Sequence, residues 1–343
     1  MKHKILALAL ALMYTINAFA GEEKRGTAGF MFLKVPMGAR EVALGQSGIT
    51  TTSGANAIYW NPANVSAATS PTFSFSYLNH FAGISSNYGA ITFPMGDAGV
   101  IGASINYMSY GDIQRTSEAN PDGGIGNYAP YELSVGVTFA KQVTDRVSGG
   151  LTVKFINSQI DLVSASNYAF DFGFTYNTDF RGLKLGFVVN NLGPQASYKG
   201  DGLLQTITVD PLTNETAYLA YESEFFNMPA SVNFGASMDL MRNEQNSITG
   251  MLEQNINSFQ ASRTNFGLEY GFQNMFFARA GYTSTLKKDR DYNTGSDAGM
   301  SGLTMGAGVD YKFNDSFGAT VDYGYLNMGI LGGTHRFSVG FKF

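Results

Sequence analysis

Residues 168–176 read YAFDFGFTY, with an aromatic side chain at every second position. Side chains of a β-strand point alternately to opposite faces, so this stretch predicts a strand with one aromatic face. Asp171 and Thr175 share the other face with small residues. An acid at mid-strand would be costly against lipid, so we expect Asp171 to face the interior of a closed membrane barrel.

The same alternation recurs along the chain, for example in residues 133–139 and 317–325. Counting these segments predicts an all-β fold, a 14-stranded antiparallel transmembrane outer-membrane β-barrel. The even count agrees with single-chain bacterial barrels, which have an even number of strands. The predicted strands are 72–80, 86–94, 98–110, 130–142, 146–157, 167–178, 183–192, 229–239, 246–256, 262–272, 275–285, 300–312, 316–327 and 334–343.

The connections between these strands alternate in length, as they do between the periplasmic and outer ends of such barrels. The short connections, which are rich in Asp, Asn and Gly, are predicted to be turns at the periplasmic end of the barrel. Two outer connections, near 81–85 and 257–261, are short. The long polar connections predicted for the outer side are 111–129, 158–166, 193–228 and 286–299.

The composition fits a membrane barrel and excludes several other classes of protein. Charged residues make up 14% of the chain, against about 25% in ordinary globular proteins. Aromatic residues also make up 14%, and there are 41 glycines. The chain has no cysteine, which excludes disulfides, thiolate metal sites and cysteine nucleophiles. An acidic chain also offers nothing to nucleic acid.

The first twenty residues have the three parts of a secretory signal peptide. Lys2 and Lys4 precede the apolar run 5–16, and Ala18-Phe19-Ala20 forms a cleavage site. The run is shorter than the roughly 20 apolar residues of a membrane-spanning helix. We expect cleavage near Ala20 and delivery to the cell outer membrane. Cleavage changes the formal charge from −5 to −7, because it removes two lysines and no acid.

The last strand carries the predicted address for insertion into the outer membrane. Its aromatic and apolar residues alternate and end on a terminal aromatic residue. This pattern predicts recognition by the barrel-insertion machinery, which is one expected partner besides outer-membrane lipid. The predicted insertion signal consists of Phe337, Val339, Phe341 and Phe343.

Residues 21–71 do not alternate and are apolar enough to need burial. They form either a periplasmic tail or an N-terminal hatch, and we favour a hatch that plugs the lumen from the periplasmic side. Fourteen strands enclose a lumen wider than side chains alone fill. The Asn61-Pro62 pair beside Trp60 breaks regular structure. The barrel itself then covers residues 72–343.

Several stretches resemble the PorV/PorQ family, and they cover essentially the whole mature chain. They include GTAGFMFLKVPMGAR (26–40), ANAIYWNPA (55–63) and LGGTHRFSVGFKF (331–343). This family belongs to the FadL-like superfamily of hatch-plugged barrels, and the chain is closer to its PorV branch. The matched hatch-motif positions are Gly38, Ala39, Arg40, Asn56, Tyr59, Trp60, Asn61 and Pro62.

The resemblance implies a component of a type IX protein secretion system. Such a barrel binds the C-terminal signal domain of exported cargo and associates with the secretion translocon and the surface sortase. The alternative is a FadL-like transporter of long-chain fatty acids or other hydrophobic small molecules across the outer membrane.

The connection 193–228 is the candidate partner loop, because it carries many apolar side chains among polar ones. Such loops either fold over the lumen or meet a partner, and the residues leave both open. The candidate partner residues are Tyr198, Tyr218, Tyr221, Phe225 and Phe226.

No catalytic, cofactor-binding or metal residues are predicted, and the chain is not expected to be an enzyme. Strand parity separates His80 from His335, which argues against a two-histidine metal site. Residues 289–295 approximate a calcium loop, but the spacing of Gly295 is wrong and Met300 stands where a glutamate is required. Residues 123–126 are a glycine cluster without the following helix that a phosphate-binding loop needs.

Overall fold

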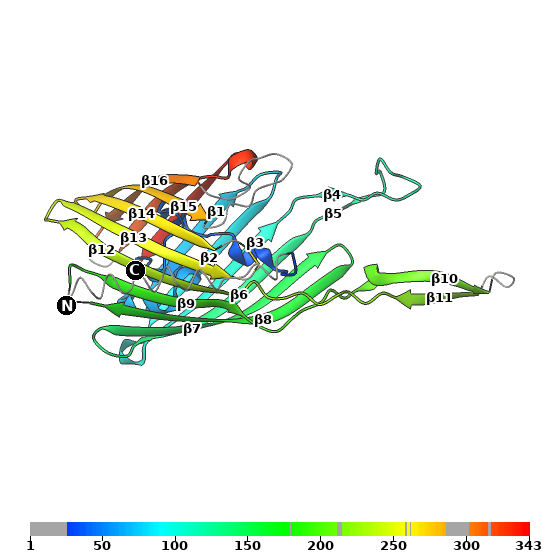
Figure 1. The fold of residues 1–343 in the computed structure, drawn as a ribbon, viewed down its shortest axis with the longest axis horizontal. Helices are drawn as coiled ribbons and strands as arrows, with labels where there is room; N and C mark the ends of the chain where they lie inside the picture. Colours follow the sequence, from blue (N-terminus) through cyan, green and yellow to red (C-terminus); the bar gives the residue numbers. More distant parts are fainter. Residues whose placement is uncertain are drawn as a thin grey trace.

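The computed structural model describes residues 26–178, 180–210, 215–257, 259–260, 262–285, 302–314 and 317–343. The predicted signal peptide and the candidate calcium loop lie outside these residues. Fourteen strands form a closed antiparallel barrel, in the order β1-β18-β17-β16-β15-β14-β13-β12-β9-β8-β7-β6-β3-β2 (Figure 1). The predicted fold class and strand number are therefore confirmed.

The observed strands agree closely with the predicted ranges. Strand β1 pairs with β18 from Thr72 opposite Lys342 to Asn79 opposite His335, and this pairing closes the barrel. The barrel strands are β1 (Thr72–Asn79), β2 (Ser85–Pro94), β3 (Val100–Ser109), β6 (Tyr131–Gln142), β7 (Val147–Ile160), β8 (Val163–Asn177), β9 (Lys184–Leu192), β12 (Ser231–Arg242), β13 (Asn246–Asn257), β14 (Arg263–Phe272), β15 (Phe276–Thr285), β16 (Gly302–Lys312), β17 (Gly318–Asn327) and β18 (Gly333–Lys342).

One predicted loop is wrong: residues 158–166 are mostly strand. Strands β7 and β8 continue until Ile160 pairs with Val163, and a turn at Asp161 joins them. Asp161 has a φ of 49°, which places it in the left-handed region. Ser158 and Ala165 still face inward, but the outward positions there carry no aromatic side chains. The alternation therefore continues without the aromatic signal.

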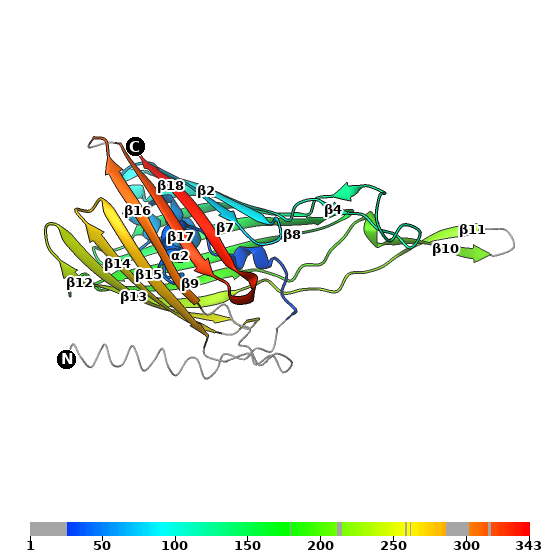
Figure 2. The same cartoon turned by 90° about the horizontal axis from the view of Figure 1, so that it is seen from above.

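Two other predicted loops contain short hairpins. Strands β4 (Ile113–Gln114) and β5 (Asn127–Tyr128) pair within the first. Strands β10 (Leu204–Asp210) and β11 (Glu215–Ala220) pair within the second. Both hairpins extend beyond the barrel, and β10–β11 reaches farthest (Figures 1 and 2).

The two faces of the barrel wall separate as the alternation predicts. Phe170, Phe172 and Phe174 are exposed on the outer face of β8, whereas Asp171 is fully buried on the inner face. This arrangement places aromatic groups toward lipid and the acid toward the lumen. No helix among the described residues is long and apolar enough to cross a membrane.

The described residues before β1, 26–71, form what we call the N-terminal segment. It consists of short helical turns and lies inside the barrel (Figure 2). Helix α2 packs against β15 to β18, and η4 packs against β3, β6, β7 and β8 on the opposite side. The segment comprises η2 (Met31–Lys34), α2 (Ala39–Ala43), η3 (Gly54–Asn56), α3 (Ala57–Trp60) and η4 (Pro62–Ala67).

Inward-facing glycines let the N-terminal segment approach the strands closely. A Cβ at Gly281 would lie 2.0 Å from the Gly45 nitrogen, and one at Gly324 would lie 2.4 Å from the Ala39 oxygen. Both are steric clashes with backbone. The glycine content of the strands therefore creates space for the segment.

Replacing Gly281 with alanine tests this close packing. We expect the free energy of unfolding to fall by about 1–3 kcal/mol, because the added methyl group forces backbone apart. The temperature at which the folded band is lost on semi-native electrophoresis reports the change. Gly89→Ala is the matched control, because its Cβ would meet only an Ile105 methyl at 3.5 Å. Equal stability of the two variants would contradict the packing argument.

Candidate functional site

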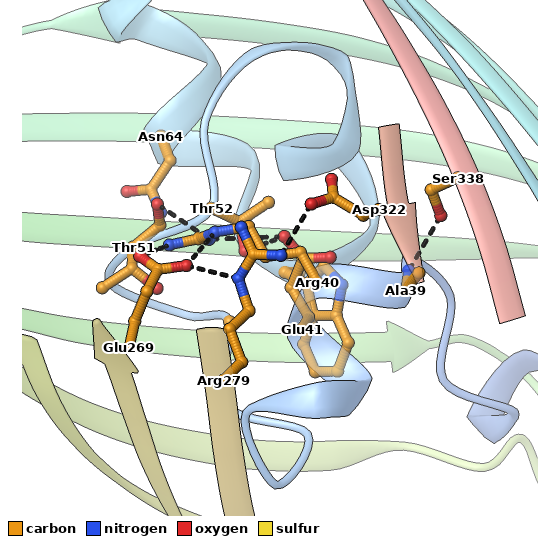
Figure 3. Close-up of polar contacts among 12 residues, drawn as sticks. Ala39, Arg40, Glu41, Thr51, Thr52, Asn64, Glu269, Arg279, Asp322 and Ser338 are labelled. Atoms are coloured by element: carbon orange, nitrogen blue, oxygen red, sulfur yellow. Dashed lines mark hydrogen bonds and ion pairs between the residues drawn. The ribbon is translucent and has the colours of Figure 1, made fainter. Parts of the chain in front are cut away.

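An ion-pair chain joins the N-terminal segment to three strands (Figure 3). Arg40 of α2 donates from Nε and Nη2 to the two carboxylate oxygens of Glu269 on β14, at 2.9 and 2.8 Å. Arg279 on β15 donates to Glu269 at 2.6 Å and to Asp322 on β17 at 2.6 Å. The charges alternate along this chain of contacts, so the half-buried Arg40 and the buried Arg279 each contact at least one carboxylate. Such forked contacts fix geometry as well as charge.

The electrostatics of Arg40 follow from this arrangement. Burial alone would lower the pKa of its guanidinium, but the Glu269 carboxylate holds that pKa above its ordinary value. Arg40 also donates to the Thr51 carbonyl at 3.4 Å. The residue therefore connects two parts of the N-terminal segment to the wall while remaining charged.

The neighbouring acid, Glu41, lies in the interior of the segment. It is almost fully buried, and its carboxylate accepts a hydrogen bond from the Thr52 hydroxyl at 3.0 Å. Burial raises the pKa of Glu41, although Arg40 opposes the shift. Gly38 has a φ of 82°, and a Cβ there would lie 2.1 Å from Glu41 Oε2. The left-handed backbone favours glycine at this position, and a Cβ would force the Glu41 carboxylate to shift.

The aromatic and Asn-Pro residues of the predicted hatch motif hold the segment together. Trp60 donates from Nε1 to the Met37 carbonyl at 3.0 Å, and the Tyr59 hydroxyl donates to the Val35 carbonyl at 2.8 Å. Asn61 caps η4 by accepting from the Ala63 N–H at 3.0 Å. Pro62 occupies the first turn of η4, where its missing N–H costs nothing.

Asn61 also ties this turn to the barrel. Its side-chain amide donates to the Ile49 carbonyl and to the Thr175 hydroxyl of β8, both at 2.9 Å. Ala39 N donates to Ser338 on β18 at 2.8 Å. Asn56 lies farther away, at the end of η3, and lines a cavity beside the Thr72 end of β1. The structure therefore brings together most of the motif, but Asn56 stands apart.

The outer half of the segment makes a second set of contacts with the wall. The Glu253 carboxylate on β13 accepts from the backbone N–H groups of Gly48 and Ile49, at 3.0 and 3.2 Å. Lys34 donates to Ser231 at 2.7 Å. Arg336 on β18 donates to the Pro36 carbonyl at 3.3 Å. These contacts are polar and come from different sides of the barrel.

The sequence pattern predicted no role for the charged strand residues that bind the segment or pair with one another inside the barrel. Among them, Asp322 and Asp171 could be recognised only as inward-facing acids. The useful signal is a charged residue at an inward position of an alternating strand. The residues missed are Lys154, Glu253, Glu269, Arg279 and Arg336.

The candidate partner residues divide into two groups. Tyr198 and Phe226 lie at the base of the β10–β11 hairpin, where Phe226 contacts Phe30 of the N-terminal segment edge-to-face, with ring centroids 5.1 Å apart. Tyr218, by contrast, is 79% exposed, and Tyr221 and Phe225 are also exposed. The base of the loop thus packs on the segment in the lumen, and the remainder projects outward.

Phe337, Val339 and Phe341 of the predicted insertion signal lie on β18, and Phe343 follows the last residue of that strand. Phe337 and Phe343 are exposed, while Val339 and Phe341 are half-buried. Phe341 stacks with Phe73 of β1 and with Phe317. These aromatic contacts connect the closing pair of strands.

The two histidines among the described residues occupy different surroundings. His335 is exposed on β18 and lies 2.7 Å from the Tyr323 hydroxyl. His80 follows β1, and its Nδ1 accepts from the Phe81 N–H at 3.0 Å. Within the described ranges, no three His, Asp or Glu side chains converge to hold a metal ion.

Replacing Glu269 with glutamine tests the ion-pair chain. We expect the free energy of unfolding to fall by about 3–5 kcal/mol, because Arg40 and Arg279 lose their shared counter-charge in a buried site. Thermal loss of the folded electrophoretic band measures this. Glu222→Gln, at an exposed position that follows β11, should leave the stability unchanged. Equal behaviour of the two variants would remove the ion-pair chain as an anchor.

Solved structures show which barrels share this fold. The toluene transporter TodX of Pseudomonas putida has a TM-score of 0.58 and 12% identity, covering 89% of this chain and 97% of that one. A FadL homologue of Pseudomonas aeruginosa has a TM-score of 0.54 and 12% identity, covering 90% and 98%. The toluene transporter TbuX of Ralstonia pickettii has 0.53 and 15%, covering 89% and 96%. At such identities the likeness concerns the fold alone.

The family comparison is more specific. No curated protein matches the chain. A family model described as "Type IX secretion system protein PorV" matches residues 19–259, which is more than half of the chain. Both the family and the fold are of non-enzymatic kinds, and the fold places the protein in the outer membrane. The chain belongs to the PorV family of type IX secretion system proteins.

Proposed function

We propose that this barrel binds the C-terminal signal domain of exported cargo at its outer side and passes the cargo to the translocon and sortase at the cell surface. The observation that carries the proposal is the β10–β11 hairpin, which projects from the barrel with Tyr218 exposed on β11; Tyr221 and Phe225 are exposed on the stretch that leads from β11 back to the barrel. Exposed tyrosine and phenylalanine side chains are typical anchors of protein interfaces. Family membership supplies the secretion context.

The hairpin is well suited to recognise an extended partner. Among the strands of the described residues, β10 and β11 pair only with each other, so each has one edge that no described strand covers. A strand of the cargo domain can add to such an edge, with the aromatic side chains giving specificity. No bond is made or broken in this role, which is recognition and transfer.

The N-terminal segment serves in this proposal as the plug of the lumen. It contacts opposite sides of the barrel and is held by the Arg40–Glu269 pair and the Glu253 carboxylate. It also extends beyond the periplasmic half, because Gly29 N donates to the Asn227 carbonyl at 3.1 Å near the hairpin base. The proposed plug would therefore fill more of the lumen than a plug confined to the periplasmic end of the barrel.

Affinity purification in mild detergent from the native membrane tests the binding role. The Tyr218→Ser, Tyr221→Ser double variant should recover at least about tenfold less cargo and translocon than the parent, as expected for two interface hot spots. Ile125→Ser is the matched control, because Ile125 is exposed in the other outer loop. Undiminished recovery with the double variant would contradict binding at the hairpin.

Deletion of residues 21–66, with a signal peptide retained, tests the plug. We expect leakage of small solutes through the outer membrane to rise, since fourteen strands enclose more space than their side chains fill. Electrophoretic mobility of the unheated protein verifies that the barrel has formed. Unchanged permeability of a correctly folded barrel would exclude the plugging role.

A second candidate function is transport of hydrophobic small molecules, favoured by the fold shared with TodX and TbuX. The cavity beside Trp60, however, is lined largely by amide and charged side chains. Hydrophobic transporters require an apolar path. Lipid extracts of the purified barrel distinguish the two: bound fatty acid or aromatic compound, without co-purified cargo, would favour transport.

A further inference from the structure

A polar cavity of about 70 Å³ lies between the N-terminal segment and the inner wall. The wall side is formed by β7, β9, β12, β13 and β14, and the segment contributes η2 and the turn around Gln46. Three cationic side chains line the cavity: Lys34, Lys154 and Arg263. The volume accommodates a group of a few heavy atoms.

The positive charges in this cavity exceed the negative ones. Lys154 is neutralised by Asp171, whose carboxylate lies 2.5 Å from its Nζ. Glu253 is the acid that lines the cavity itself, and it accepts from two backbone N–H groups. With Lys34 protonated, the three cations Lys34, Lys154 and Arg263 exceed the two acids Asp171 and Glu253 by one positive charge.

Two of the cations have no carboxylate at ion-pair distance in the described part of the chain. Lys34 donates to the Ser231 hydroxyl at 2.7 Å. Arg263 donates from Nη2 to the side-chain oxygen Oε1 of Gln260 at 3.0 Å, and its other nitrogens have no hydrogen-bond partner among the described residues. Burying cations with neutral partners alone is unfavourable. Burial, helped by Arg263 and Lys154, lowers the pKa of Lys34 to about 7.

An unpartnered donor points to the same cavity. Gln46 lines it, is only 7% exposed, and its amide nitrogen has no hydrogen-bond partner among the described residues. Its backbone φ of 62° is in the left-handed region, which is unfavourable for a residue with a Cβ. A buried amide donor held in a strained turn requires an acceptor.

We propose that this cavity binds a small anion of the carboxylate or phosphate type, held by Arg263, Lys34 and the Gln46 amide. The guanidinium offers paired donors to two oxygens, and the ammonium adds charge from the segment side. An anion bound there would bridge β14 to the N-terminal segment. The inference is independent of cargo binding, so either proposal can fail alone.

Trp60 provides the measurement, because it is the only tryptophan and lines the cavity. Its fluorescence in the purified, detergent-solubilised full-length protein is titrated with sodium acetate and with sodium phosphate, against sodium chloride at equal ionic strength. We expect a saturable change with at least one of the two anions and none with chloride. Acetate alone indicates a planar carboxylate site, and phosphate alone a tetrahedral one.

Two variants test the assignment of residues. Arg263→Gln and Lys34→Gln should each raise the dissociation constant at least about tenfold, as expected for loss of a charge-assisted hydrogen bond. Lys199→Gln is the control, because Lys199 is exposed on the outer loop. The band of the unheated protein on electrophoresis shows whether each variant has folded. If only one of the two variants folds, its dissociation constant alone tests the assignment. An absence of saturation with both anions, or an unchanged constant in the folded variants, would overturn the proposal.

Discussion

The ion pair between Arg40 and Glu269 connects the N-terminal segment with the barrel wall, and the remaining interior depends on this contact. Lipid surrounds the outer face of a membrane barrel, so charged side chains must be accommodated inside. Glu269 receives Arg40 from the segment and Arg279 from the neighbouring strand, and Arg279 reaches Asp322 in turn. Without the segment, the charges on the wall would lose a partner. The position of the segment and the placement of charged residues on the inner wall therefore depend on each other.

The same logic connects the lumen with the outer surface. The base of the β10–β11 hairpin is bound to the start of the segment, through Phe226 against Phe30 and through backbone bonds of Asn227. The exposed residues that we propose as the partner surface are thus separated by only a few residues of the chain from Phe226 and Asn227, which contact the proposed plug. A partner that displaces the hairpin base would also act on the segment. The packing of the lumen and the function proposed for the surface are linked by these few contacts.

The sequence predicted the barrel well because a strand that separates lipid from lumen must alternate, and residues 168–176 show this directly. The hairpin β10–β11 was missed because it has no lipid-facing side, so its apolar residues resembled a loop surface. The ion pair between Arg40 and Glu269 joins residues 229 positions apart. Their contact depends on how the segment folds inside the barrel, which no local pattern encodes. Gly281 and Gly324 likewise gain their meaning only from the backbone they face.

Photocrosslinking from position 218 in intact outer membranes tests the central claim most directly. A photoreactive amino acid replaces Tyr218, which is 79% exposed on the hairpin, and the same group at position 125 in the other outer loop provides the comparison. Our account predicts crosslinks from position 218 to an exported protein's C-terminal domain or to the translocon. Crosslinks to lipid alone, or the same products from both positions, would contradict it.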